Sequence, residues 1–94
     1  MGRVIWKYKL TMEPEQTLTL PLVEVLSVQA QGEELYLWAL VNPDVAAKRT
    51  IQVLLCVTGG PLSSLVLYGR FLGTVQLADG KFVLHVFVRT TAGV

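Results

Sequence analysis

The sequence has little cysteine and little histidine: Cys56 and His85 are the only ones among 94 residues. A single cysteine cannot form a disulfide within the chain. One cysteine and one histidine also fall short of the four ligands of a structural zinc site. Loop motifs that bind nucleotide phosphates are missing too, since no Gly-Lys-Ser or Gly-Lys-Thr occurs. We therefore expect no disulfide framework, no metal and no cofactor.

Long apolar runs are also missing. None approaches the roughly 18 residues that a membrane-spanning helix requires. The first ten residues, MGRVIWKYKL, lack the apolar stretch of a secretory signal peptide. The expected location is a reducing cytoplasm, most simply a bacterial one, without membrane attachment.

Charge is sparse and nearly balanced: 16% of the residues are charged, and the formal net charge is +1. This balance provides no field for duplex nucleic acid or for an anionic membrane. The signs are nevertheless segregated, because residues 1–11 carry three basic side chains and residues 12–47 carry six acidic ones. Basic and acidic strands could pair within one sheet, or the basic residues could form a local site for a small anion.

A hydrophobic fraction of 52% is high for so short a chain. A small domain with few charges has too little polar surface to cover itself, so an exposed apolar patch is expected. Such patches are typical of interfaces, and we predict a homo-oligomer.

Alternation of apolar and polar residues is the dominant pattern, and it predicts β-strands. Strong turn signals separate the strands, for example at Ala78-Asp79-Gly80, and a glycine at 69 or 73 is expected to bend the long strand before it. The segment 33–41 is apolar on both faces, which predicts a central strand buried on two sides. The predicted strands are residues 4–10, 16–20, 23–31, 33–41, 49–58, 65–77 and 81–90.

These strands predict one all-β domain over residues 1–94, a small β-sandwich or closed barrel of about seven mostly antiparallel strands. The side chains expected in its core are Val4, Trp6, Tyr8, Leu35, Leu37, Phe82, Leu84 and Val86.

Catalytic residues are scarce. Cys56 and His85 are the one conceivable pair of nucleophile and base, but both fall in the middle of predicted strands. No Gly-x-Ser-x-Gly elbow presents a nucleophile. We expect Cys56 to be a buried small hydrophobe, and we expect His85 to be half-buried and bonded to a neighbouring carbonyl or hydroxyl. The protein is therefore predicted not to be an enzyme.

Two features could bind an anion. The Thr58-Gly59-Gly60 segment could turn several N–H groups inward to form a nest, although a plain turn is the alternative. Arg70 could bind a phosphate beside the Tyr68 ring, or it could be a solvated residue paired with a glutamate.

Basic and aromatic residues near the start of the chain extend this set. Tyrosines and tryptophans at 6, 8, 36, 38 and 68 could stack on bases, or they could pack in the core or an interface. The candidate ligand-binding residues are therefore Lys7, Lys9, Thr58, Gly59, Gly60, Tyr68 and Arg70.

Several short segments occur in the order seen in one known family. They are Ile5-Trp6-Lys7-Tyr8, Gln16 to Pro21, Leu26 to Gln29, Leu37 to Pro43, Gly73 to Leu77 and Val83 to Phe87. Together they resemble a domain of unknown function in short hypothetical proteins of tailed phages and prophages. That family often has Thr-Gly-His-Pro where this chain has Thr58-Gly59-Gly60-Pro61. The resemblance implies a phage or prophage origin, but it brings no settled activity.

The predicted function is that of a non-enzymatic accessory binding protein of a phage. As a counter-defence factor it would act by stoichiometric binding in the host cytoplasm, either sequestering a small phosphorylated nucleotide signal or capping a host protein. The choice of counter-defence rests on the implied phage context and on analogy. The alternative is a virion decoration or assembly protein.

Overall fold

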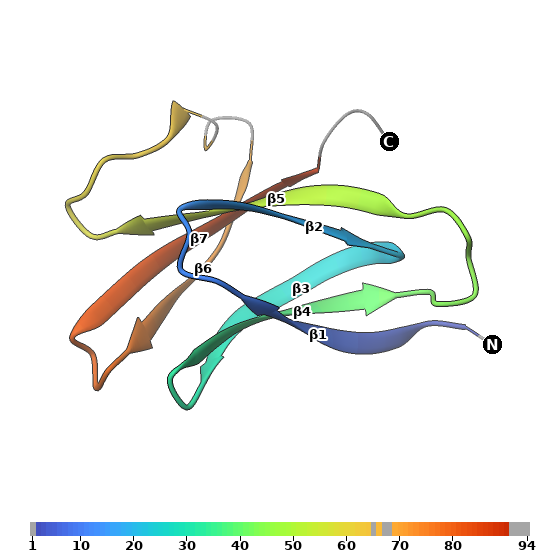
Figure 1. Cartoon of the computed structure of the whole chain (residues 1–94), viewed down its shortest axis with the longest axis horizontal. Helices are drawn as coiled ribbons and strands as arrows, with labels where there is room; N and C mark the ends of the chain where they lie inside the picture. Colours follow the sequence, from blue (N-terminus) through green and yellow to red (C-terminus); the bar gives the residue numbers. More distant parts are fainter. Residues whose placement is uncertain (1, 65, 67–68, 91–94) are drawn as a thin grey trace.

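The computed structural model describes residues 2–64, 66 and 69–90. These residues form seven antiparallel strands (Figure 1). They form a first sheet of order β1-β4-β3 and a second sheet of order β2-β5-β7-β6. No helix in these residues could cross a membrane. The predicted all-β class is confirmed, and the architecture is a small open sandwich rather than a closed barrel. The strands are β1 Val4–Leu10, β2 Glu15–Leu20, β3 Leu22–Gln31, β4 Glu34–Val41, β5 Arg49–Val57, β6 Arg70–Leu77 and β7 Phe82–Thr90.

The first sheet is centred on β4, as its apolar sequence predicted. β4 pairs with β1 on one side and with β3 on the other. Alternate β4 residues (Leu35, Leu37, Ala39 and Val41) are fully buried against the second sheet, whereas the residues between them are half-buried on the outer face. The predicted burial on two sides is therefore wrong for the outer face, because the second sheet covers only the inner one.

The second sheet contains the predicted hairpin between β6 and β7. Ala78, Asp79 and Gly80 all have positive φ angles, which give the turn its left-handed backbone. A register shift between Phe71 and Gly73 is the bulge that a glycine predicted. β6 begins at Arg70 instead of residue 65, so the expected long strand is shorter, and residues 65, 67 and 68 lie outside the described part.

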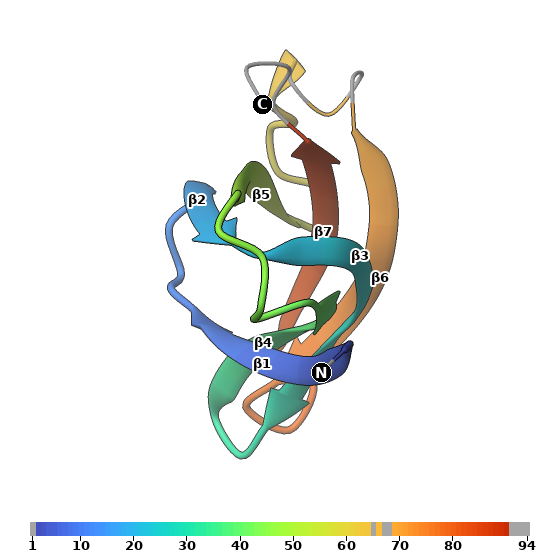
Figure 2. The ribbon, with the colours of Figure 1, turned by 90° about the vertical axis from the view of Figure 1, so that its right-hand side faces the viewer.

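Pro21 lies where the chain changes sheets. β2 ends at Leu20 in the second sheet and β3 begins at Leu22 in the first. Proline has no N–H for a ladder, so strand pairing ends there. Figure 2 shows the two sheets as crossed layers, and β3 contacts β6 where they meet.

The core lies between the sheets and contains Leu35, Leu37, Leu84 and Val86, as predicted. The prediction of burial in the core was wrong for three residues. Val4 and Trp6 are 36% and 44% exposed because β1 is an edge strand and only its last residue, Leu10, is buried. Phe82 is 47% exposed because it begins β7 at the end of the sandwich. Tyr8 is half-buried.

Candidate functional site

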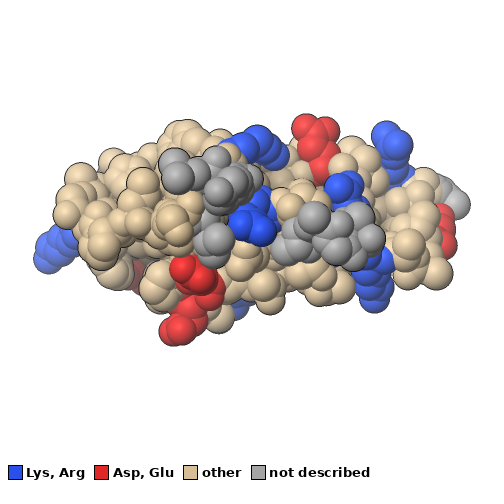
Figure 3. All heavy atoms as spheres, turned by 90° about the horizontal axis from the view of Figure 1, so that it is seen from above, with Lys and Arg blue, Asp and Glu red and all other residues tan. Residues whose placement is uncertain are grey.

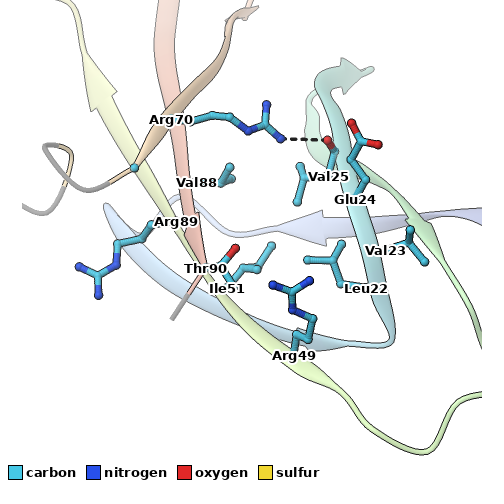
Figure 4. Close-up of a pocket in the computed structure, with 11 residues that line it drawn as sticks. Leu22, Val23, Glu24, Val25, Arg49, Ile51, Arg70, Val88, Arg89 and Thr90 are labelled. Carbon is cyan, nitrogen blue, oxygen red and sulfur yellow. Dashed lines mark hydrogen bonds between the residues drawn. The ribbon is translucent and has the colours of Figure 1, made fainter. Parts of the chain in front are cut away.

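A pocket of about 350 Å³ opens at one end of the sandwich, between β3 of the first sheet and three strands of the second (Figure 4). Its floor is apolar and its rim is charged. The lining side chains include Leu22, Val25, Ile51 and Val88 on the floor and Glu24, Arg49, Arg70 and Arg89 around it.

Antiparallel pairing explains why three arginines distant in sequence meet here. Arg49 begins β5, Arg70 begins β6, and Arg89 is the penultimate residue of β7. The start of one strand lies beside the end of its antiparallel neighbour, and Arg70 is in register with Val88 while Arg89 is in register with Gln52. All three positive charges are thereby placed at one end of the second sheet.

Arg70 spans the gap between the two sheets. Its Nη2 donates a hydrogen bond to the backbone carbonyl oxygen of Val25 at 3.0 Å (Figure 4). Val25 lies on β3, an edge strand, between two register shifts. A carbonyl that points away from the neighbouring strand has no ladder partner, and Arg70 satisfies this one. The sequence alternative was a solvated Arg70 paired with a glutamate: Arg70 is indeed exposed, but no described glutamate forms a salt bridge with it.

The other two arginines point in different directions. Figure 4 shows the Arg49 guanidinium directed into the pocket between Ile51 and Leu22, and the Arg89 guanidinium directed away from it. Among the described residues no salt bridge joins a carboxylate to any of the three; Lys9 and Glu34 form a pair elsewhere, at 3.2 Å. Seen from above, Lys and Arg side chains lie at several separate places on the molecule, with Asp and Glu side chains among them (Figure 3).

These features define what the pocket can bind. Arg49 and Arg70 approach an apolar floor from opposite sides, and Glu24 adds one acceptor at the rim. A guanidinium offers planar, forked donors that match phosphate or carboxylate oxygens. A volume near the lower end of the usual range for ligand sites suits a small molecule that has one anionic group and one apolar ring.

The Thr58-Gly59-Gly60 turn lies at the opposite end of the second sheet. Ile51 lines the arginine pocket, and Val57, just before the turn, is six residues further along β5, about 20 Å in an extended strand. Gly59 has a φ of +79°, and the Gly60 N–H donates to the Val57 carbonyl at 3.0 Å. That N–H is therefore committed to the turn.

His85 is held between two threonine hydroxyls. Its Nε2 lies 2.7 Å from Thr58 Oγ1, and its Nδ1 lies 3.1 Å from Thr74 Oγ1. The half-buried histidine bonded to hydroxyls is thus confirmed. Cys56 is buried and directly opposite His85 in the strand register, yet no hydrogen bond joins the two within the described residues.

The remaining predicted site residues lie elsewhere. Lys7 and Lys9 are on β1, on the outer face of the first sheet, and Tyr68 falls outside the described residues. Of the six candidates among the described residues, the structure brings Arg70 alone into the arginine pocket. Sequence reasoning missed Arg49 and Arg89; the excess of basic residues after position 47 was the available signal.

Comparison with known proteins adds a family. The model of a domain of unknown function, DUF7352, matches residues 1–94. The chain belongs to the DUF7352 family. No curated protein and no solved structure matches it.

Membership in DUF7352 assigns no residue to a role, so the arginine pocket is the guide to function. No group of three or more histidine, cysteine, aspartate or glutamate side chains placed to hold a metal ion occurs in the described part of this domain. The chemistry that the pocket offers is the recognition of an anion by arginine.

Proposed function

We propose that this DUF7352 domain is a non-enzymatic binding protein that takes a small phosphorylated ligand, of mononucleotide size, in the arginine pocket. One observation carries the proposal: Arg49 and Arg70 face an apolar floor from two sides, and neither forms a salt bridge with a described carboxylate.

Binding would use both charges. The phosphate would lie between the two guanidinium groups, and each charge-assisted hydrogen bond contributes about 1.5–3 kcal/mol. Arg70 would exchange its bond to the neutral Val25 carbonyl for a bond to the anion. The apolar ring of the ligand would cover Ile51 and Leu22, and Glu24 would accept a hydrogen bond from an amino group on that ring.

The biological setting rests on the sequence resemblance to short phage and prophage proteins. In that setting a binding protein without catalytic groups acts by stoichiometry, and sequestration of a nucleotide signal in the host bacterial cytoplasm would serve as counter-defence. A homo-oligomer would multiply the number of pockets.

Calorimetric titration with a panel of nucleoside monophosphates, cyclic nucleotides and inorganic phosphate tests the proposal. We expect at least one nucleotide to bind, and we expect Arg49→Ala and Arg70→Ala each to weaken that binding about tenfold or more. Lys48→Ala is the matched control, because Lys48 is an exposed cation next to Arg49 that does not line the pocket. No heat from any member at hundreds of micromolar would refute the sequestration of a nucleotide.

A second candidate is the capping of a host protein, and an apolar pocket of about 210 Å³ favours it. Exposed side chains surround this pocket, including Met12, Val57 and Phe82, and such patches are typical of protein interfaces. A role as a virion component is the further alternative. Mass spectrometry of purified virions separates it from the others, because a structural protein would be present there in stoichiometric amounts.

A further inference from the structure

The outer face of the first sheet presents three kinds of side chain in parallel rows. Each strand contributes one row, because residues that are directly opposite in an antiparallel register lie on the same face. The rows are basic on β1 (Lys7 and Lys9), aromatic on β4 (Trp38 and Tyr36) and uncharged polar on β3 (Ser27 and Gln29). The second sheet packs on the other side, where the core lies.

The register aligns these rows level by level. Lys7 pairs with Trp38, which pairs with Ser27; two residues along the strands, Lys9 pairs with Tyr36, which pairs with Gln29. The face therefore repeats one unit twice: a cation, an aromatic ring and a hydrogen-bonding group. Two residues of strand advance by about 6.7 Å, which is similar to the spacing of phosphates in an extended single strand.

Contacts on the face show that the cation and the rings are already close. Lys7 Nζ lies 4.5 Å from the Tyr36 ring centroid and 5.5 Å from that of Trp38. The two ring centroids are 6.4 Å apart. Both residues are half-buried, and the Lys7 ammonium lies over both rings, so a base that stacks there must displace it.

The acidic neighbours do not cancel these charges. Lys9 Nζ pairs with Glu34 at 3.2 Å, but both side chains are at least half exposed. Exposed pairs of this kind contribute about 0–1 kcal/mol, so a phosphate can compete for the lysine.

We propose that this face binds single-stranded nucleic acid, with two successive bases stacked on Trp38 and Tyr36 and their phosphates near Lys7 and Lys9. Stacking of a base on an aromatic side chain contributes about 1–3 kcal/mol and tolerates any sequence. A duplex would not bind in this way, because its bases already stack on one another. The net charge of +1 also provides no strong positive field to attract a duplex. This site is independent of the arginine pocket.

A second copy of the chain is a poorer occupant. Three strands about 4.8 Å apart and seven residues long provide a face of roughly 300 Å². A stable interface buries about 800 Å² on each partner. The face alone is too small for that, whereas it accommodates two nucleotides.

The test is fluorescence anisotropy of a labelled octathymidylate with the full chain. Wild type should bind it, and Trp38→Ala should weaken binding at least fivefold. The matched control is Trp6→Ala, since Trp6 is the other tryptophan and lies on the inner side of β1. With two phosphates neutralised, log K should fall against log salt with a slope of about −1.4. Lys7→Gln should reduce that slope by about 0.7, and Lys81→Gln, a control on the β6–β7 turn, should not.

A second measurement keeps the test informative if Trp38→Ala does not fold. Trp6→Phe leaves Trp38 as the only tryptophan, and the oligonucleotide should quench its emission. The proposal is overturned if wild type does not bind at hundreds of micromolar, if neither Trp38→Ala nor Lys7→Gln changes affinity, or if the single-tryptophan emission does not respond. Loss of oligonucleotide binding in Arg70→Ala alone would also overturn it, by placing the strand in the arginine pocket. A dimer that Trp38→Ala converts to monomer would assign the face to a second copy.

Discussion

Replacing Tyr8 with phenylalanine should stabilise the protein. The Tyr8 hydroxyl oxygen is buried and has no hydrogen-bond partner among the described residues. Tyr8 lies on the inner side of β1, opposite the fully buried Leu37. Phenylalanine keeps the ring in that position and removes only the hydroxyl.

The expected gain follows from the cost of an unsatisfied polar group, about 1–3 kcal/mol when it is buried. We take the lower end because the Tyr8 residue as a whole is half-buried. A gain of about 1 kcal/mol in the free energy of unfolding corresponds to a rise in Tm of roughly 4–8 °C for a domain of this size.

The pH dependence provides a second signature of the same hydroxyl. Desolvation by burial raises the pKa of Tyr8 above its ordinary value of 10.0. The folded state therefore retains its proton at a pH where the unfolded state loses it, and stability declines as the pH rises above about 10. Below that pH the difference between the two proteins should be constant; above it, the phenylalanine variant should gain further.

Urea unfolding of both proteins at pH 7 and at pH 10.5, followed by circular dichroism, measures both effects. A variant that is less stable at pH 7 would show that the hydroxyl makes a favourable bond. An identical difference at both pH values would show that its burial does not perturb the ionisation.

Three further outcomes are expected. Leu37→Ala removes a fully buried side chain between the sheets and should cost about 2–5 kcal/mol of unfolding free energy in urea titration; a loss below 1 kcal/mol would place Leu37 outside the core. Gly69→Ala would bring a Cβ to 2.8 Å from the Val88 carbonyl oxygen, so the start of β6 must move away from β7. We expect a lower Tm, and weaker ligand binding because Arg70 is adjacent. An unchanged Tm would contradict the close approach. Light scattering at tens of micromolar should give the mass of a homo-oligomer, most simply a dimer, and a strictly monomeric mass would refute self-association.

Strand positions were predictable because alternation and turn residues act locally. The hairpin at Ala78-Asp79-Gly80 follows from turn residues that adopt positive φ angles. The bulge lies near Gly73, where an added Cβ would lie only 3.3 Å from Val28 Cγ1. The central place of β4 followed from its two apolar faces. Burial on an edge strand was not predictable in this way, because Trp6 alternates like a core residue but lies on β1 at the edge of the first sheet.

The arginine pocket shows the same limit. Arg70 was chosen from its own chemistry, and nothing local in the sequence connects it with Arg49 or Arg89. Their proximity depends on which strands pair and in which register, and this order, β5 beside β7 and β7 beside β6, is a property of the whole chain. The alignment of the basic row with the aromatic row on the outer face likewise required the β1–β4 register, although each residue of these two rows had been noticed as basic or aromatic.

Mapping the ligand by NMR tests the central claim most directly. Backbone amide shifts of the labelled protein would be followed during titration with the nucleotide that calorimetry selects. The arginine pocket predicts that the largest changes fall on the amides of Arg49, Ile51, Arg70 and Thr90, with small changes at Thr58-Gly59-Gly60 and on β1. Largest changes at the Thr58-Gly59-Gly60 turn, or changes spread evenly over the chain, would contradict the assignment of the arginine pocket as the binding site.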